Sequence, residues 1–143
     1  MKPVAIGTVV SERRQHQWDG WQDHRSEIHV FPQYADGLEG VEAVSHILVV
    51  YAMDTGGKVR LKVTPQGKPT SPTVGLFASR CPWRPTPIGV TTVKLLSVEG
   101  SVLQVEGLDA VHGTQVLDIK PHWPQYDGGA APRYPPWVED LEF

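Results

Sequence analysis

Glycine or proline interrupts this chain in nearly every gap between short apolar segments, and this spacing constrains the fold more than any other feature. The 143 residues include 14 glycines and 13 prolines. The intervening segments are rich in Val, Ile and Leu, and several alternate apolar with polar residues, as strands with one buried face do. They are residues 4–10, 26–31, 45–53, 58–64, 73–79, 89–98, 102–106 and 114–120. We therefore predict about eight strands that form an all-β barrel or a tightly bent sheet.

Some segments carry more specific expectations. The run Ser45–Met53 is almost continuously apolar, which predicts a strand covered on both faces. Gly7 lies inside the first segment and indicates a bulge. Residues 58–64 alternate cleanly and predict a strand with one cationic face. One short helix is expected at Tyr34–Val44, with Asp36 as a capping residue.

The length is that of one domain, so we expect residues 1–143 to form a single domain with residues 124–143 as a proline-rich, extended C-terminal arm. This arm is expected to lie on a surface of the chain itself or of a partner. The longest apolar run, Ile47–Met53, is far too short to cross a membrane, and the N-terminus has no secretory cleavage site. A single cysteine, Cys81, excludes an internal disulfide framework. We expect a cytoplasmic protein that does not enter a membrane.

Charge is distributed unevenly along the chain. The formal net charge is −3, which by itself argues against a dedicated nucleic-acid binder. Residues 55–98, however, contain no Asp or Glu and carry a charge of +7, which leaves −10 on the remainder. This asymmetry predicts a surface suited to an anion, which is a phosphate, a carboxylate or a nucleic-acid backbone. The alternative is a solvated strand face.

The most unusual sequence of the chain lies within that cationic stretch. Three of the six residues in 82–87 are proline, so the segment is a stiff loop rather than a helix or an inner strand. Arg80 and Arg84 provide two guanidinium groups that suit an anionic or planar ligand, and Trp83 provides a stacking surface. The alternative is that both arginines bond carbonyl groups of the loop itself and that Trp83 covers the core.

Three segments resemble the signature motifs of the TsaA-like (TrmO-type) family of S-adenosylmethionine-dependent tRNA methyltransferases. Residues 75–89, GLFASRCPWRPTPIG, resemble the family's GVFATRSPxRPNPIG. Residues 38–46, LEGVEAVSH, resemble GLEGLEEFSH, and residues 108–121, LDAVHGTQVLDIKP, resemble DLLDGTPVLDIKP. The three occur in the family's order, and the resemblance covers nearly all of residues 4–127.

This resemblance implies a small β-barrel that binds S-adenosylmethionine, often as a homodimer with the site near the subunit interface. It implies methyl transfer, in the best-known members to the exocyclic nitrogen of threonylcarbamoyl-adenosine beside a tRNA anticodon. The predicted function is therefore an S-adenosylmethionine-dependent methyltransferase whose partners are tRNA and a second copy of the chain. Two rivals stay open: a methyltransferase for a small molecule, and a non-enzymatic S-adenosylmethionine-binding module.

The resemblance also implies site residues. Arginine suits the carboxylate of S-adenosylmethionine, and a short carboxylate such as Asp109 or Asp54 suits its hydroxyls or its ammonium group. The full set of expected cofactor contacts is Asp54, Thr55, Arg80, Gly89, Val90, Asp109, Ala110, Val111 and His112. The expected substrate contacts are Lys58, Arg60, Lys62 and Arg84. Methyl transfer needs positioning and a dry site, so no metal is expected, and no catalytic residue is identified.

Four departures from the family pattern weaken the transfer of the tRNA substrate more than that of the cofactor. Thr86 replaces an asparagine and His112 replaces an aspartate. Residues 17–21, QWDGW, stand where the tRNA-modifying members carry a Pro-Arg-Gln motif. We also expect no counterpart of the C-terminal domain that the bacterial tRNA enzymes add.

Three further side-chain types have plain structural readings. Cys81 is expected to be a packed thiol rather than a nucleophile. His46, His112 and His122 lack the spacing of metal ligands. Asp118 is expected to hold a strand end, although among the carboxylates it is the best candidate for proton removal.

Overall fold

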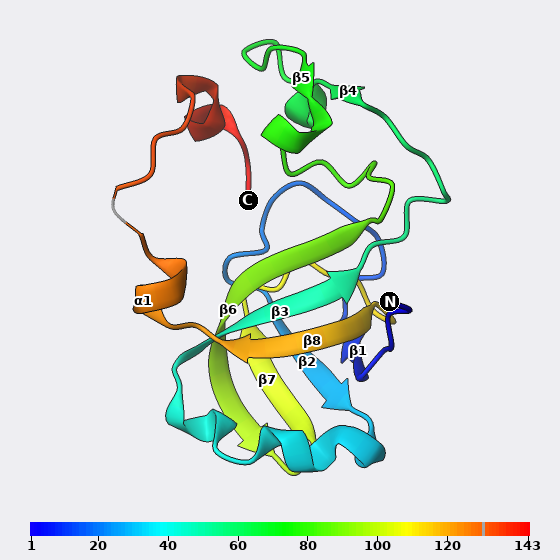
Figure 1. The fold of residues 1–143 in the computed structure, drawn as a ribbon, viewed down its shortest axis with the longest axis vertical. Coiled ribbons are helices and arrows are strands. Elements are labelled where there is room, and N and C mark those ends of the chain that lie inside the picture. The colour runs from blue at the N-terminus through cyan, green and yellow to red at the C-terminus, as the bar shows by residue number, and fades with distance from the viewer. Residues whose placement is uncertain (130) are drawn as a thin grey trace.

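The centre of the molecule is a closed barrel of six strands (Figure 1). The computed structural model describes residues 1–129 and 131–143. The strands follow the order β1–β2–β7–β6–β3–β8, all neighbours are antiparallel, and β8 pairs again with β1. Their bounds are β1 Gly7–Val10, β2 Arg25–Val30, β3 His46–Ala52, β6 Ile88–Glu99, β7 Val102–Glu106 and β8 Gln115–Pro121. The predicted all-β barrel is confirmed.

Alternate residues of the strands fill the barrel, because successive side chains of a strand point to opposite faces. Ile47, Val49 and Tyr51 of β3 are buried, whereas Leu48 and Val50 between them are only half-buried. The strand predicted to be covered on both faces is therefore fully covered on its inner face and partly covered on its outer face. The fully buried interior of the barrel consists of Val9, Ile28, Ile47, Val49, Val93, Leu103, Val105, Leu108 and Val116.

Irregular pairing occurs elsewhere than predicted. Gly7 pairs in register with Val30 and Val116, so it forms no bulge. Its missing side chain allows a close approach instead, since a Cβ there would lie 2.4 Å from the carbonyl oxygen of His29. The register shifts lie between Val50 and Tyr51 in the β3–β8 pairing and between Leu95 and Ser97 in the β6–β7 pairing.

Between β3 and β6 the chain leaves the barrel, and we call residues 54–87 the excursion. It rises above the barrel in Figure 1 and contains a separate two-stranded sheet of β4 (Lys62–Val63) and β5 (Val74–Gly75). The predicted strands 58–64 and 73–79 are therefore reduced to two residues each. The barrel closes without these segments, so it offers them no strand edge to pair with. In addition, Gly56 and Gly57 adopt positive φ values of 58° and 74° just before residue 58, which turns the chain there.

The predicted short helix at Tyr34–Val44 is present, but it has other bounds and 3₁₀ geometry. Two 3₁₀ segments, Pro32–Leu38 and Val41–Ala43, form it and cross the lower end of the barrel in Figure 1. Gly40 separates them with a φ of 83°, a conformation that ends a right-handed helix. Asp36 makes no capping hydrogen bond with its side chain.

The expected C-terminal arm leaves the barrel through the short helix α1 (Pro124–Asp127) and ends in a 3₁₀ turn at Pro136–Asp140 followed by Leu141–Phe143. In Figure 1 it runs from the left of the barrel up to the excursion. The arm is thus extended for part of its length, although Ala130 lies outside the described residues. Among the helices that the structure describes, none has both the length and the apolar character that a membrane crossing requires.

Candidate functional site

A carboxylate and two hydroxyl groups meet on the barrel near the point where β3 ends, the excursion begins and β6 returns from it. A guanidinium group from the excursion is attached to β6 at the same end. Tyr51 of β3 donates its hydroxyl hydrogen to Asp109 Oδ1 at 2.6 Å. Thr91 of β6 donates to the same oxygen, and the Tyr51 and Thr91 hydroxyl oxygens lie 3.1 Å apart. Arg80 comes from the excursion and donates through Nη2 to the carbonyl oxygen of Val90. We call this group the Asp109 cluster, which consists of Tyr51, Arg80, Gly89, Val90, Thr91 and Asp109.

Burial and the neighbouring Asp109 carboxylate together raise the pKa of Tyr51 well above its ordinary value. The phenol therefore stays protonated and acts as a hydrogen-bond donor at neutral pH. The cluster holds one negative charge, on Asp109, and one positive charge, on Arg80. It can accept hydrogen bonds from a hydroxyl or an ammonium group and donate them to a carboxylate.

The structure brings four of the nine expected cofactor residues into this cluster: Arg80, Gly89, Val90 and Asp109. Gly89 pairs with Tyr51, and a Cβ on Gly89 would lie 2.4 Å from two ring carbons of that tyrosine. Ala110 follows Asp109 and is buried. Sequence reasoning missed Tyr51 and Thr91, although one signal was present. Both residues carry a hydroxyl group at an inward-facing position of a strand, where the alternation leads one to expect an apolar residue, and the two strands flank the excursion that holds the proline-rich loop.

Asp54 and Thr55 lie at the first turn of the excursion, next to the cluster along β3. Met53 N–H donates to the carbonyl of Pro87 at 2.8 Å, which brings the two ends of the excursion together. Asp54 Oδ1 accepts from Gly56 N–H at 2.9 Å, so this carboxylate stabilises its own turn. Thr55 is buried. Their expected contact with a cofactor stays a prediction.

His112, which follows Val111 in the chain, contacts the N-terminal loop, residues 11–24. His112 N–H donates to the carbonyl of Arg13 at 2.8 Å, and Ser11 N–H donates to His112 Nδ1 at 3.3 Å. The Ser11 hydroxyl in turn lies 2.8 Å from His24 Nε2. The substitution of His112 for the family's aspartate therefore coincides with contacts to the loop that contains residues 17–21, although not to those residues themselves.

Trp21 anchors the N-terminal loop. Its ring is buried, its Nε1 donates to the carbonyl of Gln17 at 2.7 Å, and the Arg13 guanidinium lies 4.5 Å from the ring centroid. His24 packs edge-on against it, and burial, followed by the charge of Arg13, lowers the pKa of His24. The loop is therefore a packed structure beside the Asp109 turn.

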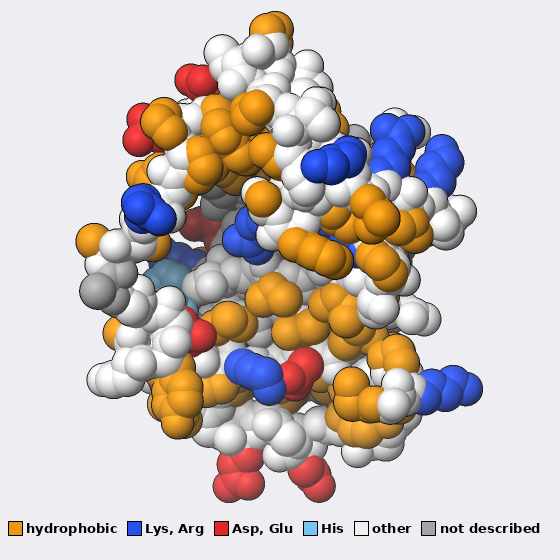
Figure 2. Space-filling view, turned by 45° about the horizontal axis from the view of Figure 1, so that its top comes forward, with side chains coloured by type: hydrophobic (Ala, Val, Ile, Leu, Met, Phe, Trp, Pro, Cys, Tyr) orange, Lys and Arg blue, Asp and Glu red, His pale blue; other side chains and the backbone are white. Residues whose placement is uncertain are grey.

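Three of the four expected substrate residues lie on the first half of the excursion. Arg60 and Lys58 place their charged groups 5.3 and 5.9 Å from the centroid of the Trp83 ring, and Arg60 N–H donates to the Trp83 carbonyl at 3.0 Å. Lys62 lies in β4. We call Lys58, Arg60, Lys62 and Trp83 the cationic edge. Figure 2 shows basic side chains beside hydrophobic ones at the side where this part of the excursion projects.

Arg84 behaves differently from these residues. Its Nη2 donates to the carbonyl oxygens of Ser79 and, at 3.4 Å, Leu76. This matches the alternative in which a loop arginine bonds carbonyls of its own loop, and Arg80 also bonds a carbonyl, that of Val90. Each guanidinium has further N–H donors, so both proposed ligand roles stay predictions.

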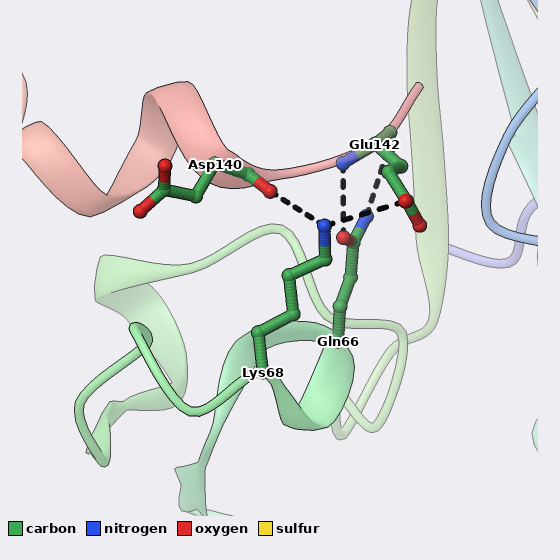
Figure 3. Close-up of polar contacts among 4 residues, drawn as sticks. All are labelled: Gln66, Lys68, Asp140 and Glu142. Atoms are coloured by element: carbon green, nitrogen blue, oxygen red, sulfur yellow. Dashed lines mark hydrogen bonds and ion pairs between the residues drawn. The ribbon is translucent and has the colours of Figure 1, made fainter.

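The C-terminal tail, residues 136–143, is attached to the excursion (Figure 3). Gln66 exchanges two hydrogen bonds with the backbone of Glu142, at 2.7 and 3.0 Å. Lys68 Nζ donates to the carbonyl of Asp140 at 2.6 Å and lies 3.5 Å from the Glu142 carboxylate. Gly20 N–H of the N-terminal loop donates to the carbonyl of Phe143 at 3.2 Å. The tail thus connects the excursion with the N-terminal loop.

The remaining polar candidates lie outside the cluster. Asp118 on β8 bonds its neighbours, since its carboxylate lies 2.7 Å from Lys120 Nζ and accepts from Ile119 N–H at 2.9 Å. Cys81 is half-buried with a free thiol. No group of three or more metal-ligating side chains occurs among the residues that the structure describes.

Two hollows of the barrel surface lie at the opposite end of β6 from the Asp109 cluster. One of about 400 Å³ is lined by Asp36, Glu39, Glu42 and Val98, and a smaller one of about 170 Å³ adjoins it at Val44 and Leu95. Both are acidic or apolar and contain none of the expected site residues. The length of β6 therefore separates these hollows from the Asp109 cluster.

Comparison with known proteins gives a consistent result. The family model described as the tRNA-methyltransferase O N-terminal domain matches residues 11–128. An S-adenosyl-L-methionine-binding protein of Archaeoglobus fulgidus is 43% identical over 107 residues, which cover 75% of this chain and 76% of the relative. A human tRNA (adenine(37)-N6)-methyltransferase is 36% identical over 99 residues, which cover 68% of this chain and 22% of that protein.

Solved structures agree with these sequence relatives. A crystal structure of TrmO from Pseudomonas aeruginosa superimposes with a TM-score of 0.78 at 28% identity and covers 99% of this chain. A second TrmO crystal structure gives a TM-score of 0.76 at 29% identity and covers 95% of the chain. The chain spans 62% and 65% of the lengths of these two structures.

Proposed function

Since the chain belongs to the tRNA-methyltransferase O N-terminal domain family, we propose that it is an S-adenosylmethionine-dependent methyltransferase that acts on an adenosine of tRNA. The proposal joins the family match to the Asp109 cluster, which is the observation that carries it. The relatives named as S-adenosyl-L-methionine-binding proteins and as a tRNA (adenine(37)-N6)-methyltransferase support the same cofactor and the same class of substrate.

The donor set of the Asp109 cluster fits S-adenosylmethionine. Asp109 suits the ribose hydroxyls or the ammonium group, and Arg80 suits the carboxylate. Ile88 and Val90 expose apolar surface, each at 39%, on the face of β6 opposite to Gly89 and Thr91. When bound, S-adenosylmethionine supplies a methyl group on a positively charged sulfur. The chain's own task is therefore to position the partners and exclude water.

Arg80 and Tyr51 have separate parts in that task. The Arg80 hydrogen bond to Val90 holds the proline-rich loop against β6, which keeps the guanidinium charge close enough to act on the Tyr51 hydroxyl of the cluster. The neutral Tyr51 adds no second negative charge, so the cluster stays close to electrically balanced. Asp54, Thr55, Ala110, Val111 and His112 border the cluster along the chain and stay proposed cofactor contacts.

The cationic edge is the proposed contact for RNA. Lys58, Arg60 and Lys62 suit phosphates, and the half-buried Trp83 beside them suits an unpaired base. Val59 and Leu61 are exposed on the same segment, at 50% and 66%, and add apolar surface. A single-stranded loop offers both phosphates and unstacked bases, so it fits this edge better than a regular duplex does. Arg84 stays a proposed substrate contact from within the loop.

The finer details of the proposal rest on the family resemblance. The proposed acceptor is the exocyclic nitrogen of threonylcarbamoyl-adenosine beside the anticodon. The proposed working form is a homodimer in the cytoplasm, with each site near the subunit interface. Sedimentation of the purified chain tests the dimer directly, and a single monomeric species at micromolar concentration would remove it.

A small-molecule acceptor is the second candidate. Arg80 and Arg84 both bond carbonyls of the protein, and the charge outside residues 55–98 is −10, which opposes a polynucleotide. This candidate shares the cofactor and the methyl transfer and differs only in the acceptor.

Methyl transfer separates the two candidates. The purified chain is incubated with S-adenosylmethionine carrying a labelled methyl group and with total tRNA, and the tRNA is then digested to nucleosides. Label in a modified adenosine supports the tRNA proposal, with tRNA that lacks threonylcarbamoyl groups as the control for the finer acceptor. Saturable donor binding without transfer to tRNA would favour the small-molecule candidate or a binding module.

A further inference from the structure

Two strands of the barrel direct hydroxyl groups at a single oxygen of Asp109. Tyr51 approaches from β3 at 2.6 Å and Thr91 approaches from β6, and both donate to Oδ1. The other oxygen, Oδ2, accepts no hydrogen bond from the described residues and is not among their buried unpaired polar atoms. One oxygen is thus held by the barrel, while the other is accessible to a ligand.

The tyrosine cannot easily adopt another position. Its side chain is 4% exposed, and its ring lies against the Cα of Gly89, its pairing partner on β6. The sheet is irregular at this point, because the β3–β8 register shifts between Val50 and Tyr51. Since the ring is packed on the barrel and the hydroxyl is bonded, the phenol defines a fixed location for Asp109 Oδ1.

Both hydroxyls act as donors to a charged acceptor. Hydrogen bonds to a carboxylate are roughly twice as strong as those between neutral groups. Two such bonds to one oxygen restrict rotation of the carboxylate and determine the direction of the second oxygen. A hydroxyl on Tyr51 that merely needed a partner would be satisfied by one contact, such as the one to Thr91 at 3.1 Å.

We propose that Tyr51 and Thr91 are positioning residues that orient Asp109 so that its Oδ2 accepts a hydrogen bond from S-adenosylmethionine. This inference rests on the proposed function, because it names the partner of Oδ2 as a ribose hydroxyl or the ammonium group of that donor. It also explains the glycine at position 89. The missing side chain makes room for the tyrosine that holds the carboxylate.

A double-mutant cycle tests the inference. The variants are Tyr51→Phe, Thr91→Val, Thr91→Ser, Asp109→Ala and the combination of Tyr51→Phe with Asp109→Ala, each purified as the full chain. The probe is S-adenosylhomocysteine, a stable analogue of the donor, and its affinity is measured by calorimetry. Urea unfolding of every variant separates affinity from stability. Thr92→Val, at the exposed neighbour of Thr91 on β6, is the matched control.

Asp109→Ala is expected to weaken binding about 50-fold, and Tyr51→Phe and Thr91→Val about 5-fold each. Thr91→Ser keeps the hydroxyl and should restore the wild-type affinity, whereas Thr92→Val should not change it. In the Asp109→Ala background, Tyr51→Phe should cause no further loss, because the residue through which it acts is gone. A purely structural role would lower stability equally in both backgrounds and leave the affinity unchanged.

The outcomes distinguish this inference from the proposed function. If the wild-type chain binds the probe but Asp109→Ala binds it equally well, the inference is overturned and the proposed function stands. If the effects of Tyr51→Phe and Asp109→Ala are additive, Tyr51 does not act through Asp109 and the inference is also overturned. If the folded wild-type chain does not bind the probe, the proposed function fails and this inference fails with it.

Discussion

The Asp109 cluster and the cationic edge are built by different means. The cluster belongs to paired strands, and its side chains are held by neighbours from β3, β6 and the β7–β8 connection. The cationic edge belongs to the excursion, whose own sheet has only two residues in each strand. The first region has one carboxylate held in place, and the second has several cations on an exposed segment. The difference fits the two proposed roles, in which the cluster binds the small methyl donor and the exposed edge binds RNA.

The largest expected effect comes from filling the space beside Tyr51. Gly89→Ala introduces a Cβ that would lie 2.4 Å from the Tyr51 ring, so the ring or the strand must move. Overpacking of this kind costs about 2–3 kcal/mol in the free energy of unfolding and should also reduce donor affinity. Urea unfolding and calorimetry measure the two effects.

Gly75→Ala is the matched control in the excursion, because nothing lies within 4 Å of a Cβ at that position and its φ is negative. We expect a change below about 0.5 kcal/mol there. Equal losses in the two variants would contradict the view that the barrel site is the more tightly packed region.

Removal of the Arg80 guanidinium should affect the donor next. Arg80→Ala loses the bond to Val90 and the positive charge of the cluster, so we expect about 10-fold weaker donor binding in calorimetry. Arg25→Ala is the control, because Arg25 is an exposed barrel arginine paired with Glu106. An unchanged affinity of Arg80→Ala would reject the role assigned to this residue.

Substitutions in the cationic edge should have the opposite effect, because they should weaken RNA binding and leave donor binding unchanged. The triple variant Lys58→Gln, Arg60→Gln and Lys62→Gln should keep its donor affinity but bind tRNA more weakly. The slope of log affinity against log salt should decrease by about 2, since each lost phosphate contact removes about 0.7 for a single strand. A triple variant at Arg25, Lys120 and Arg133, basic residues outside the excursion, is the control for total charge. If the two triple variants behave alike, the edge has no special part in RNA binding.

A smaller effect is expected at the attachment of the tail. Lys68→Met removes the contacts with Asp140 and Glu142 and leaves the Gln66 hydrogen bonds in place. We expect faster amide exchange in residues 136–143 and a loss of less than about 1 kcal/mol in global stability, because such surface contacts contribute little. Unchanged exchange would mean that Lys68 does not hold the tail.

The smallest effect concerns pH. Burial lowers the pKa of His24 below its ordinary value of 6.5, so the unfolded chain binds a proton there more readily than the folded chain does. The contribution of His24 to stability is therefore present above pH 6.5 and decreases as the pH falls below it. The wild-type chain and His24→Gln, compared by urea unfolding at pH 7.5 and 5.5, should differ in this dependence by a small amount, since the ring is only partly buried. Parallel pH dependences would contradict the role of burial at this residue.

The sequence predicted the barrel well because its strands follow the two-residue period that a closed core requires. It failed at residues 58–64, because the closed barrel left no strand edge for them. At Tyr34–Val44 it predicted the helix but not its bounds, because Gly40 divides the segment. These outcomes depend on the whole fold, which a local pattern does not contain.

Prediction of the site had a similar limit. The family motifs identified Arg80, Gly89, Val90 and Asp109, which the structure brings together. They could not identify Tyr51 and Thr91, because these residues reach Asp109 only through the pairing of β3 with β6 and the path of the chain after β7. Likewise, the inward direction of Arg84 depends on the loop carbonyls that it meets.

The claim that the two regions bind different ligands is tested most directly by mapping backbone amide chemical shifts in the full chain. S-adenosylmethionine is added first, and an anticodon stem-loop RNA is added to a second sample. The account predicts that the donor shifts residues 80, 89–91 and 109–111, whereas the RNA shifts residues 58–62 and 83. Donor-induced shifts confined to residues 58–62, or no shifts at 89–91 and 109–111 at saturating donor, would contradict it.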